Sequence, residues 1–436
     1  MDQKPFLSFG FCMMVLSLFL LPYCRPAAGS EALTLIRQFD SLLNKKEFFR
    51  LERQLALHHE ELPAARRLYF EAALDNAFNR NSSCVARIDS VLGSAPAGFQ
   101  DSLKVNLLQL SGDSYFKMGF YAQAARTDSL LIHDFNKTMD SAALASVKDD
   151  WLIRNALRNQ APQTTEVGAG AVLTWSRDSI GLMEFPFRSH AQTVNAIFDT
   201  RANISSITRS YAEKLHLHLL DVNYTGGSGV TGLQFKMGLG VADSLYIGGV
   251  LVLHAVFQVM PDSILYIAPL HFQLNVIMGL PVIAQLQELQ IYNDGRLVIP
   301  SVPTPGDLHN MALDGLDPVV LLRSDGDTLL YHFDSGASST VLYATYFNRY
   351  HAAILRSGHS KRTKFGGAGG VKVNETFMLP SFRLELGPRA ITIDSVSVLT
   401  EKISDAERFY GNVGQDFMRQ FKEMTLNFRD MYVKGI

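Results

Sequence analysis

The sequence contains little cysteine, little net charge and few long apolar runs. Only three of its 436 residues are cysteines, and two of them, Cys12 and Cys24, lie near the N-terminus. Cys84 is then the single cysteine of the remaining chain, which excludes a scaffold held by internal disulfides and is typical of a small core residue. The formal net charge of −2 leaves no basic footprint, so we expect no nucleic-acid partner. After the N-terminus, no uncharged run is long enough to span a bilayer.

The first residues of the chain are the exception to this scarcity of apolar runs. Lys4 precedes an uncharged stretch from 6 to 21, and small residues follow just before residue 30, where a signal peptidase could cut. We therefore interpret residues 1–29 as a signal peptide and expect an exported protein that is periplasmic, on the cell surface or secreted. Two alternatives stay open. The stretch could remain as a membrane anchor, or Cys24 could carry a lipid anchor, although the bulky Tyr23 before it is atypical of lipoprotein signals.

The next segment, residues 30–160, has the apolar spacing of helices. Large apolar side chains recur every three or four residues, as at Leu33 and Ile36. The segment 86–92 returns as 125–131, 39 residues later (125 − 86), which indicates an internal repeat. The sequence therefore predicts an all-α domain built from repeated helical hairpins.

One part of this domain resembles a tetratricopeptide repeat. Between Gly112 and Ala124, small and aromatic residues alternate at the spacing that lets two antiparallel helices approach closely. Such an array could be a scaffold or a brace for the rest of the chain. A groove that binds a protein partner also stays open, because no residue in the segment decides between these roles.

From residue 171 onwards the pattern changes to short strands. Runs of β-branched and aromatic residues bounded by turn signals predict strands at 172–175, 183–187 and 194–198. Segments rich in proline, glycine and other small residues predict linkers at 161–170 and 301–318. The sequence after the first linker is therefore expected to form two lobes, at residues 171–300 and 319–436.

Two aspartates stand at equivalent places of these lobes. Asp199 belongs to the motif Phe-Asp-Thr-Arg-Ala and Asp334 to the motif Phe-Asp-Ser-Gly-Ala, 135 residues later (334 − 199). Each motif follows an apolar strand, and an apolar segment that ends in glycine recurs at the same offset, at 276–279 and 411–414. A segment repeated in register brings two carboxylates together on a pseudo-twofold axis. Carboxylates that share one proton can act as an acid and a base.

Each lobe next contains a glycine-rich stretch and a closing turn. Glycine-rich hairpin tips can take positive φ angles and flex over a ligand, so these stretches are predicted to be flaps. An apolar-glycine turn follows, then a short helix predicted at 280–289 or 415–422, and then a final strand. The predicted flap glycines are Gly226, Gly227 and Gly229 in the first lobe and Gly366, Gly367 and Gly369 in the second.

In this order of parts, residues 170–436 resemble the retropepsin-like aspartic proteases, in a two-lobed bacterial form preceded by a helical domain. Residues 334–338 fit the aspartate motif of that family, and residues 413–417 fit its closing turn. The resemblance implies an N-terminal all-α helical-repeat domain followed by an all-β, double-lobed acid-protease barrel of the retropepsin/pepsin kind. It also implies a catalytic pair, Asp199 and Asp334, with supporting residues Thr200, Ser335, Gly336, Ala202 and Ala337.

The resemblance further implies how the pair would be held and used. Thr200 and Ser335 would join the two turns through hydroxyl-to-backbone hydrogen bonds across the axis. Two carboxylates within a few ångströms cannot both ionise near neutral pH, so one activates a water molecule and the other donates a proton. The expected substrate is a peptide or a protein, and neither a metal ion nor another cofactor is needed.

Arg201 departs from the family pattern, which has glycine at this position. A permanent positive charge there would lower the pKa values of the carboxyls and favour a doubly ionised, inactive pair, unless the side chain points to solvent. Three functions therefore stay open. The chain could be an exported aspartic endopeptidase, a catalytically degenerate protein that still binds peptides, or a surface scaffold built on the helical repeats.

Two further motifs do not fit their surroundings. Gly227, Gly229 and Gly232 have the spacing of a dinucleotide fingerprint, but a strand is predicted after them where that fold requires a helix. His216 and His218 have no carboxylate or cysteine at ligand spacing, so no metal site is predicted there.

Overall fold

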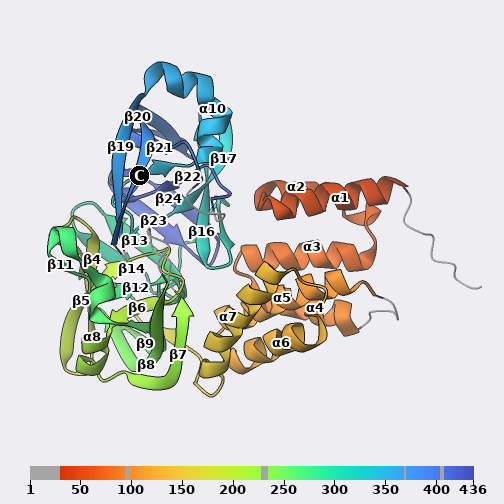
Figure 1. Cartoon of the computed structure of the whole chain (residues 1–436), viewed down its shortest axis with the longest axis horizontal. Coiled ribbons are helices and arrows are strands. Elements are labelled where there is room, and N and C mark those ends of the chain that lie inside the picture. Colours follow the sequence, from red (N-terminus) through yellow and green to blue (C-terminus); the bar gives the residue numbers. More distant parts are fainter. Residues whose placement is uncertain (1–29, 94–98, 227–233, 368–369, 403–406) are drawn as a thin grey trace, which may run out of the picture.

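A helical region lies beside a larger region of β-strands, as Figure 1 shows. The computed structural model describes residues 30–93, 99–226, 234–367, 370–402 and 407–436. The predicted succession of a helical and a β-rich region is confirmed. The predicted signal peptide and Cys24 lie outside the described residues. Among the helices in the described ranges, none has the length and apolar character needed to cross a membrane.

The helical region is a row of helices in which each packs on the next. Its elements are α1 (Ser30–Asn44), α2 (Phe48–His58), the 3-10 helix η1 (His59–Glu61), α3 (Ala64–Ala77), α4 (Asn81–Gly93), α5 (Asp101–Lys117), α6 (Tyr121–Asp134) and α7 (Ser141–Leu157). Gly119, with a φ of 75°, makes the tight connection between α5 and α6. The carboxylate of Asp140 accepts a hydrogen bond from the N–H of Ala143 at 2.8 Å and so caps α7. The repeated segments 86–92 and 125–131 fall in α4 and α6, the second helices of two neighbouring hairpins.

The first β half covers residues 164–299. Its strands are β1 (Thr164–Glu166), β2 (Ala171–Thr174), β3 (Ser176–Arg177), β4 (Met183–Ser189), β5 (Gln192–Phe198), β6 (Ser205–Thr208), β7 (His218–Gly226), β8 (Phe235–Ile247), β9 (Val250–Met260), β10 (Tyr266–Ile267), β11 (Phe272–Gln273), β12 (Val276–Met278), β13 (Glu288–Tyr292) and β14 (Arg296–Ile299). Its helices are α8 (Arg209–Lys214), η2 (Asp262–Leu265), η3 (Ala268–Leu270) and α9 (Leu280–Gln285).

The second β half covers residues 311–435. Its strands are β15 (Met311–Asp314), β16 (Asp317–Ser324), β17 (Asp327–Phe333), β18 (Val341–Leu342), β19 (His359–Gly367), β20 (Gly370–Leu386), β21 (Arg389–Leu399), β22 (Gly411–Val413), β23 (Glu423–Asn427) and β24 (Tyr432–Gly435). Its helices are α10 (Ala344–Ser357) and α11 (Gln415–Met418).

The two halves repeat one strand order. In the first half, hydrogen-bonded neighbours follow the order β9-β6-β12-β5-β4-β8-β7. In the second half, where β20 pairs with β16 as well as with β21, they follow the order β21-β18-β22-β17-β16-β20-β19. In each, the strand that leads to the aspartate motif is parallel to the strand of the closing turn, β5 to β12 and β17 to β22. The same apolar pattern therefore folds the same way twice and puts the two aspartate motifs in equivalent positions.

A five-stranded sheet joins the halves. Its order is β2-β14-β13-β23-β24, so strands of the first half pair directly with strands of the second. The junction is the antiparallel pairing of β13 with β23, in which Leu289 lies opposite Leu426. In Figure 1 these strands lie between the two larger sheets.

Several local details differ from the sequence-based expectations. The predicted linkers 161–170 and 301–318 contain the strands β1 and β15. The strand β1 pairs with β9, and β15 pairs with β16. The helices α9 and α11 end at Gln285 and Met418, before the predicted ends at 289 and 422, and the strands β13 and β23 of the central sheet begin at Glu288 and Glu423. The overall division of the chain into domains remains a prediction.

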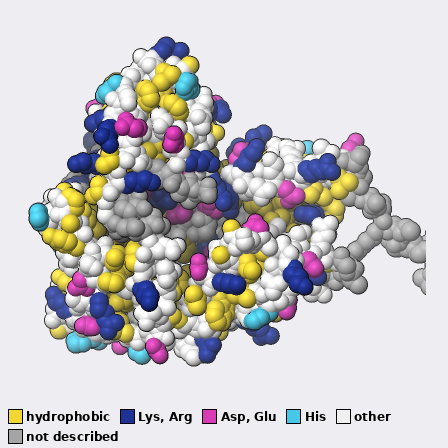
Figure 2. All heavy atoms as spheres, in the orientation of Figure 1, with side chains coloured by type: hydrophobic (Ala, Val, Ile, Leu, Met, Phe, Trp, Pro, Cys, Tyr) yellow, Lys and Arg dark blue, Asp and Glu magenta, His cyan; other side chains and the backbone are white. Residues whose placement is uncertain are grey.

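The hydrophobic core is continuous between the helical region and the β halves. One cluster of buried apolar side chains contains Phe49 and Phe78 from the helices together with Phe198 and Phe333 from the strands. A second cluster brings Tyr121 of α6 against the first half. Ion pairs add to this contact, as between Lys46 and Asp314 at 2.8 Å. The face in Figure 2 carries mixed positive and negative side chains, in keeping with the small net charge.

Candidate active site

Asp199 lies in the turn directly after β5. Its backbone N–H donates to the carbonyl of Met278 in β12 at 3.1 Å. Its side-chain Oδ1 accepts hydrogen bonds from the N–H groups of Arg201 at 2.8 Å and Ala202 at 3.1 Å. An aspartate that accepts from the two N–H groups after it stabilises a tight turn, so the motif explains its own local structure.

Asp334 has the same arrangement after β17. Its N–H donates to the carbonyl of Val413 in β22 at 3.0 Å. Its Oδ1 accepts from the N–H groups of Gly336 and Ala337, both at 3.0 Å. The hydrogen bonds that hold each turn therefore use one carboxyl oxygen, Oδ1, on both aspartates.

The two turns are joined through Thr200 and Ser335, whose side chains are fully buried. The hydroxyl of Thr200 donates to the carbonyl of Phe333 at 2.8 Å and accepts from the N–H of Ser335 at 3.1 Å. The hydroxyl of Ser335 donates to the carbonyl of Phe198 at 2.8 Å and accepts from the N–H of Thr200 at 3.0 Å. These are the crossed hydroxyl-to-backbone bonds that the family resemblance implies, and they fix the two aspartate turns side by side.

The closing turns support the aspartate turns from the other side. The N–H of Gly279 donates to the hydroxyl of Ser205 at 3.0 Å, and that of Gly414 donates to the hydroxyl of Thr340 at 3.2 Å. A Cβ on Gly279 would lie 2.4 Å from the carbonyl oxygen of Ala202, so this contact requires glycine. The closing turn at Gly279 is therefore packed against the backbone of residues 202–205 without space for a side chain.

Symmetry ends at Gly336 and its counterpart Arg201. A Cβ on Gly336 would lie 2.4 Å from the carboxyl carbon of Asp199, so glycine lets that carboxyl approach the second turn. At the equivalent place in the first half, the Arg201 side chain reaches into the second half. Its Nε lies 3.4 Å from an oxygen of Asp317, and its Nη1 lies 3.4 Å from Oδ1 of Asn412 and 3.8 Å from Oδ2 of Asp334.

Of the two orientations considered from the sequence, Arg201 takes the one near the aspartate pair, because its Nη1 lies 3.8 Å from Oδ2 of Asp334. Its side chain is only 25% exposed, so it does not point freely to solvent. The guanidinium interacts with two carboxylates, and Asp317, at 3.4 Å, lies closer to it than Asp334, at 3.8 Å. Asn412 in turn donates from Nδ2 to Oδ2 of Asp334 at 3.0 Å.

Burial and neighbouring charges shift the pKa values of Asp199 and His332. Burial and the neighbouring Asp334 raise the pKa of Asp199 to about 7, although the N–H groups of its turn and the guanidinium of Arg201 act in the opposite direction. Burial and then Arg201 lower the pKa of His332 to about 2, so this imidazole is neutral. Burial and the neighbouring Asp334 thus favour the protonated form of the Asp199 carboxyl.

The predicted flap glycines lie partly outside the described residues. Gly226 ends β7, and Gly366 and Gly367 end β19, which pairs with β20 up to the contact of Gly367 with Gly370. Gly227, Gly229 and Gly369 fall in the ranges that the structure does not describe. The described glycines Gly226, Gly366 and Gly367 thus lie at the ends of strands that pair antiparallel with the next strand of their half.

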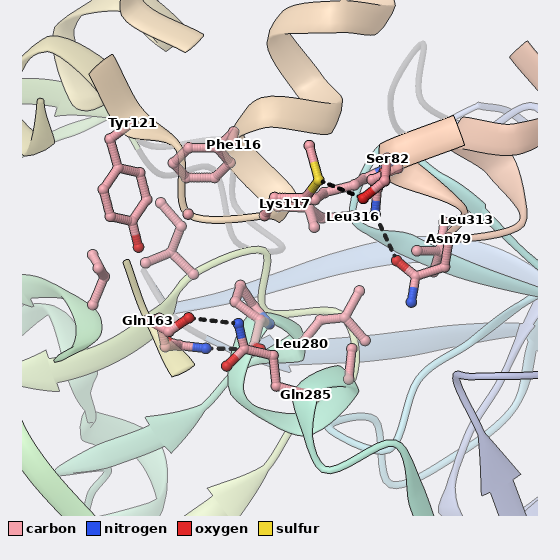
Figure 3. A pocket seen from close by; sticks show the side chains of 17 residues that line it. Asn79, Ser82, Phe116, Lys117, Tyr121, Gln163, Leu280, Gln285, Leu313 and Leu316 are labelled. Carbon is pink, nitrogen blue, oxygen red and sulfur yellow. Dashed lines mark hydrogen bonds between the residues drawn. The ribbon is translucent and has the colours of Figure 1, made fainter. Parts of the chain in front are cut away.

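A cavity of about 260 Å³ lies at the junction of the helical region with the β halves, and neither Asp199 nor Asp334 lines it (Figure 3). Phe116 and Tyr121 line it from the helices, and Leu280 and Gln285 line it from α9. Gln285 donates to the carbonyl of Gln163 at 3.0 Å, which ties α9 to the segment before β1. Because the N–H of Leu280 also donates to the carbonyl of Ala202, the wall of this cavity is bonded to the Asp199 turn.

Asp317 and Asn412 were not among the residues predicted from the sequence. The repeat offset contains a signal that could have found them. Asp317 is equivalent to Leu182 and Asn412 to Ile277, so two polar residues replace two apolar ones near a single aspartate.

Within the described residues, no group of three or more histidine, cysteine, aspartate or glutamate side chains could hold a metal ion. Comparison with protein-family models and with curated proteins finds no match for this chain.

Proposed function

We propose that this chain is an aspartic endopeptidase of the retropepsin-like kind, with its cleft between two pseudo-symmetric lobes. The observation that carries the proposal is the crossed pair of hydroxyl bonds of Thr200 and Ser335, which holds Asp199 and Asp334 in equivalent turns. The repeated strand order of the two halves supports it. An ordinary surface turn needs neither a partner turn nor a buried crosslink of this type.

In the proposed mechanism, a water molecule is bound between the two carboxyls. Ionised Asp334 takes a proton from this water as its oxygen forms a bond to the carbon of the peptide carbonyl. Protonated Asp199 donates its proton to the carbonyl oxygen, which gives a neutral gem-diol intermediate. The proton on Asp334 then passes to the amide nitrogen, the C–N bond breaks, and one of the two diol protons returns to Asp199 while the other stays on the new carboxylic acid. The free enzyme is thereby restored.

We also propose that the protein is exported, with residues 1–29 as the signal peptide, and that it acts in the periplasm, at the cell surface or outside the cell. A lipid anchor at Cys24 is the alternative form of the same N-terminus. The helical region is proposed to act as a brace for the β halves, since its buried side chains belong to the same core. This role does not exclude a protein partner at its outer face.

The second candidate is a protein that binds peptides without cleaving them. One observation favours it: Arg201 places a positive charge 3.8 Å from Oδ2 of Asp334, where a family member has glycine. If that charge keeps both carboxyls ionised, neither can donate a proton to the carbonyl oxygen of the bound peptide, and the peptide is not cleaved.

Cleavage of a mixed peptide library between pH 3 and 7 tests the proposal. Wild type should cleave, and Asp334→Asn and Asp199→Asn should each lose at least about a thousandfold in rate, because each removes one of the two proton carriers. Asp294→Asn is the matched control, since Asp294 is a half-exposed aspartate remote from the pair. Peptide binding without cleavage in wild type, with cleavage restored in Arg201→Gly, would identify the degenerate binder instead.

A further inference from the structure

The environment of Asp334 differs from that of Asp199 at three positions that the repeat makes equivalent. Arg201 corresponds to Gly336, with the same offset of 135 residues that separates Thr200 from Ser335. By this offset Asp317 corresponds to Leu182, and Asn412 to Ile277. The pairings of β4 with β5 and of β16 with β17 keep the same register, so these correspondences hold in space. Arg201 and Asn412 contact the carboxyl of Asp334, and Asp317 contacts Arg201.

The contacts among these side chains form a chain that ends on Asp334. Arg201 is held by Asp317 and contacts the carbonyl oxygen of the Asn412 side chain. Because that oxygen faces the guanidinium, the NH₂ group of Asn412 faces the other way and donates to Oδ2 of Asp334 at 3.0 Å. The orientation of the amide is therefore fixed by a donor on one side and an acceptor on the other.

This arrangement treats the two carboxyls unequally. On Asp334, Oδ1 accepts two backbone N–H groups and Oδ2 accepts the Asn412 amide, with a guanidinium nearby. The hydrogen bonds described for Asp199 all reach Oδ1. Donors on both oxygens stabilise the ionised form of a carboxyl, whereas an oxygen without a donor is the natural place for a shared proton.

We propose that Arg201, Asp317 and Asn412 form a positioning cluster that keeps Asp334 ionised and leaves the shared proton of the pair on Asp199. The proposal rests on the proposed function for its catalytic meaning. Arg201 then contributes to the function of the site by stabilising the ionised form of Asp334. Asp317 limits this stabilisation, because its carboxylate holds the guanidinium at one side of the aspartate pair. The cluster explains why an arginine at a glycine position is compatible with one retained proton.

Of the titratable groups around the cluster, His332 and Tyr343 do not add charge near neutral pH, and the buried Glu407 helps to raise the pKa of the Tyr343 phenol. Burial and Arg201 keep His332 neutral, and burial raises the pKa of Tyr343, so that its phenol stays protonated. Burial also raises the pKa of Asp317, and Arg201 acts in the opposite direction. Asp314 is the remaining described carboxylate that influences Asp317, and it is paired with Lys46. The balance at the pair is therefore set by Arg201, Asp317 and Asn412.

Titration of the pair in the whole chain tests this proposal without any need for turnover. The protein is labelled with aspartate carrying ¹³C in the side-chain carboxyl, and its spectra are recorded from pH 3 to 9. Asp199→Asn and Asp334→Asn assign the two signals. The wild-type pair should show two separated midpoints, the upper one near the value of about 7 that belongs to Asp199.

Three variants should move the lower midpoint, two of them upward and one downward. Asn412→Ile, which installs the residue of the other half, should raise it by about one pH unit, because ionised Asp334 loses a donor. Arg201→Gly should also raise it, since a cation is removed. Asp317→Asn, which preserves shape, should lower it, because an anion beside Arg201 is lost. Asn195→Ile is the matched control, as the exposed Asn195 donates to the remote carboxylate of Glu184 and should leave the midpoints unchanged.

Kinetics supply the second readout. On a cleaved peptide, Asn412→Ile should lower kcat by about tenfold with KM within about twofold of wild type, since the amide positions a carboxyl and does not touch the peptide. Equal midpoints in wild type and Asn412→Ile, or shifts of Arg201→Gly and Asp317→Asn in the same direction, would overturn the cluster. If no peptide is cleaved but the midpoints move as expected, the cluster stands and the proposed peptidase function fails.

Discussion

Gly336 has no side chain, and the position of Asp199 depends on that absence. A Cβ at residue 336 would lie 2.4 Å from the carboxyl carbon of Asp199, well inside van der Waals contact. The carboxyl of Asp199 therefore occupies space that every other residue type would take. On the opposite side, Arg201 has a Cβ, and the carboxyl of Asp334 is held by Asn412 instead.

Gly336→Ala should lower peptide cleavage by about a hundredfold, because the new methyl group displaces the Asp199 carboxyl by several tenths of an ångström or more. The steady-state rate on one peptide at fixed pH measures this. Gly93→Ala is the control, since a Cβ there meets nothing within 4 Å. Equal rates for Gly336→Ala and Gly93→Ala would contradict the tight approach of the two turns.

The Asp199→Asn variant should become more stable relative to wild type as the pH rises. The pKa of Asp199 is raised from its ordinary value of 3.8 to about 7, so the folded chain holds a proton that the unfolded chain has released. Wild type therefore loses stability between pH 4 and 7, whereas an asparagine has no proton to release. The free energy of unfolding of the variant relative to wild type should grow by on the order of 2 kcal/mol from pH 4 to pH 8.

Urea unfolding at a series of pH values measures that difference. Asp294→Asn should show a constant difference from wild type over the same range, because the pKa of this exposed carboxyl is lowered by Arg296 and it stays ionised throughout. A difference for Asp199→Asn that shrinks as the pH rises would show that the carboxyl is not protonated in the folded chain.

Two turns become one element through the hydroxyls of Thr200 and Ser335. Each hydroxyl is both donor and acceptor to the backbone of the opposite turn, and both side chains are buried. Removal of one hydroxyl leaves a buried carbonyl and a buried N–H without a partner, which costs more than the bonds themselves contribute.

Thr200→Val keeps the shape of the side chain and removes this hydroxyl. We expect the free energy of unfolding to fall by about 2–4 kcal/mol, because the carbonyl of Phe333 and the N–H of Ser335 lose their partner. Thr200→Ser keeps the hydroxyl and should cost about 1 kcal/mol through the lost methyl group. Chemical denaturation of both variants decides the point, and equal losses would mean that the hydroxyl contributes nothing specific.

The elements around the aspartates were predictable where the signal was local. Asp199 and Asp334 follow apolar strands and precede small residues, and these motifs alone indicate the turns that the structure contains. Asp317 and Asn412 escaped notice because their contact with Arg201 arises only when β16 and β22 approach the first turn in space. The alternation of apolar and polar residues along one strand does not indicate which residue of another strand its side chains will contact.

At the scale of the whole molecule, the central five-stranded sheet makes the two halves interdependent. Glu288 in β13 is fully buried, and its carboxylate accepts hydrogen bonds from Thr304 and from Asn427 of β23. One side chain thus links the first half, the segment between the halves and the second half. This shared sheet was not predicted, because the pairing of β13 with β23 joins segments that would suit two separate lobes equally well.

Glu288→Ala should lower the free energy of unfolding by about 3 kcal/mol, since several buried donors lose their acceptor. Hydrogen exchange should rise together in β14 of the first half and β24 of the second, because both flank the damaged pair of strands. Glu385→Ala is the control, as Glu385 lies at the surface of β20 beside Arg323. Faster exchange in one half alone would show that the halves are independent units.

Because the two halves joined by this sheet belong to one chain, every residue change occurs once in the molecule. In an assembly of two identical chains, an arginine at position 201 would appear on both sides of the axis, and two cations would stand beside the aspartates. Here the counterpart is Gly336, which has no room for a Cβ beside Asp199. A single continuous chain can therefore let its two copies diverge and assign different protonation states to two carboxyls that an identical pair would have to share equally.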